Sequence, residues 1–174
     1  MIKRILEKKL KEMAGKYPVI TLTGPRQSGK STLVKNAFKK YKYVSLEDID
    51  MRNFARSDPR GFLSEFSDRT IIDEVQRVPD IISYIQTLTD KHNKEGMYIL
   101  TGSQNFILSE KISQSLAGRT SILKLLPFSS KEMNDGGIVF KNIDEEIFTG
   151  SYPRRFAKTI APLAACRVII ESYD

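Results

Sequence analysis

The residues most able to do chemistry lie in one stretch, Leu22 to Thr32, which reads LTGPRQSGKST. From Gly24 it follows the pattern G-x-x-x-x-G-K-[ST], in which glycines let successive backbone N–H groups face an anion. In this pattern Lys30 reaches the β- and γ-phosphates of a nucleotide, and the hydroxyl of Ser31 is a ligand for Mg²⁺. The alternative is an ordinary Gly-containing turn. An apolar β-branched strand before the motif and an amphipathic helix after it favour phosphate binding. The residues expected to bind the nucleotide are Gly24, Pro25, Arg26, Gln27, Ser28, Gly29, Lys30, Ser31 and Thr32.

Two acids follow a later apolar run, in RTIIDEVQRVPD. In a domain with a phosphate loop, the first acid, Asp73, holds the Mg²⁺ shell together with Ser31. The second acid, Glu74, orients and polarises the attacking water. The alternative is a solvated acidic turn. The apolar run before the pair and the phosphate loop upstream favour a catalytic role, and with it hydrolysis of the nucleotide.

Polar residues also end the run MYILTGSQNF, where Ser103, Gln104 or Asn105 can contact the γ-phosphate or the lytic water, although TGS is also common turn chemistry. Arg119 precedes the next apolar run and has two open interpretations. It is either an arginine that reaches the nucleotide of a neighbouring subunit in a homo-oligomer, or a cation at the end of a helix.

The other reactive residues give little evidence for a catalytic or metal-binding site. His92 is the only histidine and lies in a polar stretch, which predicts an exposed side chain and gives a Ser-His-Asp hydrolase little support. Cys166 is the only cysteine, so neither an internal disulfide nor a Cys/His zinc site can form. Glu47 and Asp48 are interpreted as turn residues.

The elements that must position these residues alternate between strands and helices. Short apolar runs predict strands at 19–23, 42–46, 70–73, 97–101 and 121–126, several of them apolar enough to be covered on both faces. Helical patterns occupy 31–40, 58–66, 79–88 and 109–118, and residues 1–16 form a basic amphipathic helix. The alternation predicts an α/β doubly wound domain with a parallel central sheet. A last helix is expected near the end of the chain, at 161–174.

Chain length and net charge limit the number of domains and the kinds of binding partner. The 174 residues fit one domain, or one domain and the start of another: a P-loop core with its N-terminal helix at 1–128, and the start of a C-terminal region at 129–174. The net charge of +7 permits contact with nucleic acid, but the basic residues are spread along the chain. No apolar run is long enough to span a bilayer, so we expect a cytoplasmic protein without a membrane partner.

These motifs resemble the AAA-type ATPases of bacteria and archaea whose loop reads G-P-R-Q-x-G-K-[ST]. The resemblance runs roughly from Lys3 to Pro153, through GPRQSGKST, YVSLED, DPRGFL, IIDEVQRVPDIISYIQ, YILTGSQNF, SLAGRTSILKLLPFS and GSYP. It implies an ATP-hydrolysing P-loop NTPase core with sheet order 5-1-4-3-2. In that core Asp73 and Glu74 are the Walker B pair, Ser103 or Gln104 is a sensor, and Arg119 acts in trans. Family members usually continue into a C-terminal part with winged-helix and nuclease-like character.

Three functions remain to be separated. The first is an Mg²⁺-dependent ATPase that couples hydrolysis to a conformational change. The second is a non-hydrolysing module in which the nucleotide gates an interaction surface or a nucleic-acid-binding surface. The third, a small-molecule kinase, has no use for a water-polarising Glu74.

Overall fold

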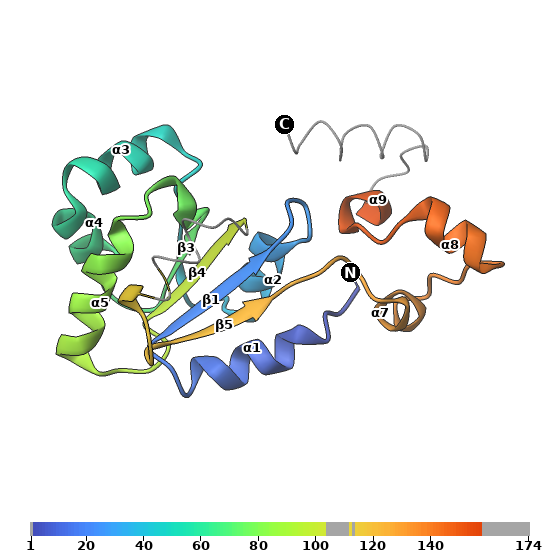
Figure 1. The fold of residues 1–174 in the computed structure, drawn as a ribbon, viewed down its shortest axis with the longest axis horizontal. Helices are drawn as coiled ribbons and strands as arrows, with labels where there is room; N and C mark the ends of the chain where they lie inside the picture. The colour runs from blue at the N-terminus through green and yellow to red at the C-terminus, as the bar shows by residue number, and fades with distance from the viewer. Residues whose placement is uncertain (1, 104–111, 113, 158–174) are drawn as a thin grey trace.

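A parallel five-stranded sheet forms the centre of the computed structural model, which describes residues 2–103, 112 and 114–157 (Figure 1). The strand order is β2-β3-β4-β1-β5, so the predicted order 5-1-4-3-2 is confirmed. The strands are β1 (Val19–Gly24), β2 (Lys42–Ser45), β3 (Thr70–Asp73), β4 (Tyr98–Ser103) and β5 (Thr120–Lys124).

Burial differs between the centre and the edges of the sheet. All six residues of β1 and all four of β3 are buried, as expected for strands covered on both faces. The edge strands β2 and β5 keep several exposed side chains, among them Ile122, which is 52% exposed. The prediction that several strands are covered on both faces therefore holds for β1 and β3, whereas the edge strands are only partly covered.

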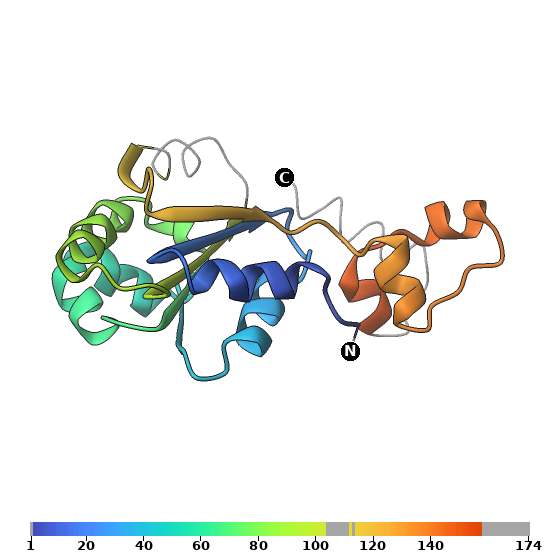
Figure 2. The same cartoon turned by 90° about the horizontal axis from the view of Figure 1, so that it is seen from below.

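Helices cover the two faces of the sheet (Figure 2). On one face, α1 (Leu6–Ala14) and α2 (Lys30–Ala37) pack Leu10 and Leu33 against Ile20 and Ile71. On the other face lie α3 (Ile49–Ser57), α4 (Pro59–Glu65), the short 3-10 helix η1 (Val75–Arg77) and α5 (Ile81–His92). Alternate strand residues thus supply two separate cores, one for each layer of helices.

The layer formed by α3, α4 and α5 differs from the prediction in two places. Helix α3 was not expected, because Asp48 was interpreted as a turn residue; its carboxylate instead caps the helix by accepting from the N–H groups of Asp50 and Met51. Helix α5 runs on through His92 and ends where Asn93 adopts a left-handed conformation, with φ 43°. The His92 side chain is exposed, as predicted.

Three short helices follow the sheet and lie beyond the end of β5: α7 (Ser130–Asp135), α8 (Ile143–Thr149) and α9 (Pro153–Ala157) (Figure 1). The helix predicted at 161–174 and Cys166 fall outside the described residues. Within the part of the chain that the structure describes, no helix is long and apolar enough to cross a membrane.

Candidate active site

The predicted site residues converge at one edge of the sheet because parallel strands end together. The loop 24–30 leaves β1, Asp73 and Glu74 end β3, and Ser103 ends β4. Gly24 pairs in register with Ser103 across β1 and β4. Residues separated by up to about eighty positions in the chain thus meet at the carboxyl ends of adjacent strands, where open α/β sheets bind their ligands.

Backbone conformation explains the glycines of the loop. Gly24 has φ 151°, and a Cβ placed there would lie 2.1 Å from the carbonyl oxygen of Leu125. Gly29 has φ 90° and precedes the first turn of α2. Gln27 is also left-handed, with φ 62°. These conformations curl the chain between β1 and α2, and glycine is needed where the backbone approaches most closely.

Lys30 lies across this loop and is buried. Its ammonium group donates to the carbonyl oxygens of Gly24 at 3.0 Å and Pro25 at 2.9 Å. Burial lowers the pKa of Lys30, and the negative charges of Glu74 and Asp73 oppose that shift. The lysine of the loop and the two acids after β3 are therefore close enough to interact electrostatically.

Asp73 is held by two hydroxyl groups from the neighbouring strands. The phenol of Tyr43 on β2 donates to its Oδ2 at 2.6 Å, and the hydroxyl of Thr101 on β4 donates to its Oδ1. Burial, followed by the hydrogen bond to Asp73, raises the pKa of Tyr43. The Lys35 ammonium of α2 lies 3.5 Å from the centroid of the Tyr43 ring. The Asp73 carboxylate is thus fixed in one orientation.

Glu74 differs from its neighbour. It adopts a left-handed conformation, with φ 58°, at the junction between β3 and η1. Its carboxylate accepts a hydrogen bond from the Gln76 amide and is half-buried. A residue other than glycine in this conformation carries backbone strain of about 1–3 kcal/mol, a cost that often accompanies functional positions.

The polar atoms around the loop fit a triphosphate with Mg²⁺. Ser28 Oγ, Ser103 Oγ and Gln27 Oε1 are buried and have no hydrogen-bond partner among the described residues. Ser31 and Asp73 offer the oxygen donors that Mg²⁺ prefers. No group of three or more His, Cys, Asp or Glu side chains that could hold a metal occurs in the described part of the chain.

The remaining predicted residues are placed as follows. Arg119 lies outside this cluster of contacts: its guanidinium pairs with Asp90 of α5 and donates to the carbonyl oxygen of Ala117 at 3.1 Å. The hydrogen bond to Asp90 raises the pKa of Arg119. Thr32 and Arg26 are exposed. Gln104, the other sensor candidate, lies outside the described residues.

A buried arginine joins the loop to the segment after β5. Arg4 was interpreted as part of a basic helix face, but it precedes α1 and is 9% exposed. Its guanidinium donates to the Ser28 carbonyl oxygen at 3.1 Å and pairs with Glu132 of α7 at 3.1 Å. On the same side of the loop, a Cβ at Gly29 would lie 3.5 Å from Cγ of Pro153. The phosphate loop is therefore linked to α7 through Arg4, and its Gly29 lies near Pro153 of α9.

The sequence matches a family model described as an AAA domain over residues 16–134, more than half of the chain. The chain belongs to this AAA domain family.

The chain is also similar to two curated proteins in sequence and to solved structures in fold. One uncharacterised protein from Mycobacterium bovis and one from Mycobacterium tuberculosis are each 33% identical over 118 residues, which is 67% of this chain and 27% of the relative. The chain thus spans about a quarter of the length of these curated relatives. The Walker-type ATPase of Pyrococcus abyssi superimposes with a TM-score of 0.59 at 16% identity, covering 88% of this chain and 65% of that one. The AMPPCP-bound DnaA of Aquifex aeolicus does so with a TM-score of 0.55 at 15% identity, covering 88% and 57%.

Sequence reasoning missed two sets of contacts around the site of this AAA domain. Tyr43 pairs in register with Ile71, two residues before Asp73, and a long side chain reaches such a diagonal neighbour. A prediction that β2 pairs with β3 in this register would have placed Tyr43 near Asp73. The Arg4–Glu132 pair joins positions 128 residues apart, and no local pattern signals it.

Proposed function

We propose that this AAA domain is an Mg²⁺-dependent ATPase core. The observation that carries the proposal is the meeting of Lys30, Asp73 and Glu74 at the carboxyl ends of β1 and β3, with the Asp73 carboxylate held by Tyr43 and Thr101. A sensing module needs the lysine and the loop. It does not need a second acid held in a strained conformation beside them, so hydrolysis explains more of the site than nucleotide binding alone does.

Each residue has one task in this proposal. The loop amides and Lys30 bind the β- and γ-phosphates, so the ammonium exchanges its two carbonyl partners for anionic oxygens. Ser31 and Asp73 hold Mg²⁺, which neutralises developing charge on the phosphates. Glu74 accepts a hydrogen bond from the attacking water and polarises it. Ser103, beside Gly24 in the register, contacts the γ-phosphate or that water.

The proposal includes coupling to a conformational change. Arg4 bonds both the Ser28 carbonyl and Glu132, so a loop that rearranges around a phosphate shifts α7 as well. Pro153 lies close enough to Gly29 to respond to the same movement. On this basis 1–128 is the ATPase core, and 129–174 begins the region that receives its motion.

The first experiment compares phosphate release from ATP and Mg²⁺ by the wild-type chain and by Glu74→Gln. The amide cannot act as a base, so we expect turnover to fall by about 10² to 10⁴ while ATP binding persists. Lys30→Ala is the matched binding variant, and calorimetry should show weaker ATP affinity. Equal turnover by the wild type and Glu74→Gln would remove Glu74 from the mechanism. ATP binding without any release by the wild type would favour the non-hydrolysing module.

A second experiment tests whether a neighbouring chain supplies Arg119. Turnover per chain is measured over a wide range of protein concentration for the wild type, Arg119→Ala and Asp90→Ala. If Arg119 acts in trans, turnover per chain rises with protein concentration and is lost in Arg119→Ala. Turnover is retained in Asp90→Ala, because that substitution only frees the guanidinium from its partner in the same chain. Equal loss in both variants would assign Arg119 to the local ion pair alone.

A further inference from the structure

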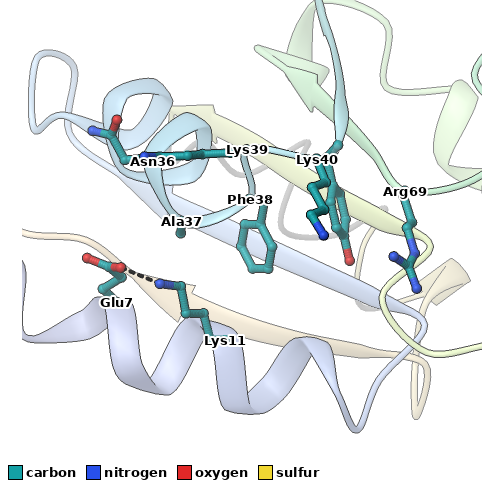
Figure 3. Close-up of a pocket in the computed structure, with 9 residues that line it drawn as sticks. Glu7, Lys11, Asn36, Ala37, Phe38, Lys39, Lys40 and Arg69 are labelled. Atoms are coloured by element: carbon teal, nitrogen blue, oxygen red, sulfur yellow. Dashed lines mark hydrogen bonds and ion pairs between the residues drawn. The ribbon is translucent and has the colours of Figure 1, made fainter.

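A basic groove lies at the amino ends of the strands, whereas the phosphate loop lies at their carboxyl ends. Figure 3 shows the residues that line this groove. It has a volume of about 580 Å³ and runs between α1 and the turn that leads from α2 into β2. Lys39 and Lys40 come just before β2, and Arg69 comes just before β3, so all three lie at the amino ends of parallel strands. The groove lining consists of Glu7, Lys11, Asn36, Ala37, Phe38, Lys39, Lys40, Tyr41 and Arg69.

The positive charges of this groove are only partly neutralised. Lys11 pairs with Glu7 at 2.5 Å along α1. Lys39, Lys40 and Arg69 are exposed, and none of them has a side-chain hydrogen bond or ion pair within the described ranges. Arg69 also has φ 46°, a left-handed conformation that costs energy in a residue other than glycine. Three cations from two connections thus line the groove, and none of them is paired with an anion among the described residues.

An aromatic ring lies among these cations. Figure 3 shows the Phe38 ring directed into the groove, between Lys11 of α1 and Lys40. Its other side packs on Tyr41, with ring centroids 4.9 Å apart, and the Tyr41 hydroxyl donates to the Gly96 carbonyl oxygen at 2.8 Å. A half-buried ring fixed from behind, with Lys40 on one side and the Glu7-paired Lys11 on the other, resembles the stacking platforms on which single-stranded nucleic acids bind.

We propose that this groove binds the phosphate backbone of a single-stranded nucleic acid. Three separate cations suit successive phosphates better than one small anion. A membrane surface is disfavoured because the groove is concave and none of the exposed large hydrophobic side chains among the described residues lines it. The site is distinct from the nucleotide site, since it lies at the other ends of the strands, and it does not depend on ATP hydrolysis.

The charges set the size of the expected effect. Three phosphate contacts on a single strand give a slope of about −2 for log K against log salt. Raising the salt from about 50 to 200 mM should therefore weaken binding by about 20-fold. Lys39→Gln/Lys40→Gln should reduce the slope by about 1.4.

The test is fluorescence anisotropy of a labelled oligothymidylate of about 20 nucleotides, titrated with the full chain at several salt concentrations. Lys131→Gln/Lys141→Gln is the matched control, because it removes the same charge from exposed residues near α7. We expect only the Lys39→Gln/Lys40→Gln variant to bind the oligonucleotide more weakly and with a smaller salt dependence. Saturating ATP with Mg²⁺ should not displace the oligonucleotide. Equal losses in both double variants, no binding at low salt, or displacement by ATP would overturn the proposal. So would retention on anionic phospholipid vesicles without oligonucleotide binding.

Discussion

Tyr43→Phe tests whether the Asp73 carboxylate is held as the structure indicates. The substitution removes one hydroxyl and keeps the ring, so the contact with Lys35 remains. A hydrogen bond to a charged group contributes about 1.5–3 kcal/mol. Tyr43 is 37% exposed, so water can partly replace its hydroxyl, and we expect a loss near the lower limit, about 1.5 kcal/mol. In a chain of this size, that corresponds to a fall in Tm of about 3–6 °C.

Differential scanning calorimetry measures the loss, and Tyr84→Phe is the control. Tyr84 lies on α5, is 36% exposed, and has no hydrogen-bond partner among the described residues, so its hydroxyl should contribute less than about 0.5 kcal/mol. A double-mutant cycle with Asp73→Asn isolates the pair, because the coupling disappears if the phenol stabilises something else. Equal melting temperatures for the two phenylalanine variants would refute the argument.

The same variant bears on the proposed Mg²⁺ site. A carboxylate that loses one of its two hydroxyl donors can turn away from the metal position, and losing such a supporting contact typically weakens metal binding by about 10–100-fold. We expect Tyr43→Phe to need more Mg²⁺ for half-maximal ATP binding, and Tyr84→Phe to match the wild type. An unchanged Mg²⁺ requirement together with a lowered Tm would mean that the hydroxyl supports only the fold.

Gly24→Ala should cost more than about 3 kcal/mol in urea denaturation, because its Cβ would lie 2.1 Å from a backbone oxygen; a wild-type midpoint would contradict this. Arg4→Met should destabilise by about 3–5 kcal/mol, and adding Glu132→Leu should restore part of the loss; simple additivity would show that the pair is not coupled. Burial raises the pKa of both Tyr43 and Tyr98 above the usual 10, so the folded state keeps their protons while the unfolded state releases them, and stability is lost as pH rises past 10. Ultraviolet titration of the folded protein should show tyrosine ionisation that continues above pH 10, and a titration complete near pH 10 would exclude the shifts.

The sequence was most informative where a local pattern determines a local structure. Continuous apolar runs located every strand to within a few residues, and the glycines of the loop match the positive φ angles at Gly24 and Gly29. Helix α3 was missed because its apolar positions are few and its Asp48 cap also suits a turn. Contacts between distant residues were out of reach, since Tyr43 reaches Asp73 only after two strands have paired.

The Arg4 contacts show why these distant pairs matter to a mechanism. An ion pair as buried as Arg4–Glu132 is a weak source of stability, because desolvation offsets most of its attraction. It does fix an arrangement: Glu132 also accepts from the Ile5 N–H at 2.7 Å and completes the cap of α7 through Ser129. Arg4 adds the Ser28 carbonyl to the same network. In the proposed function, a phosphate that reshapes the loop must either carry Arg4 with it or break a buried hydrogen bond, and the first outcome would move α7.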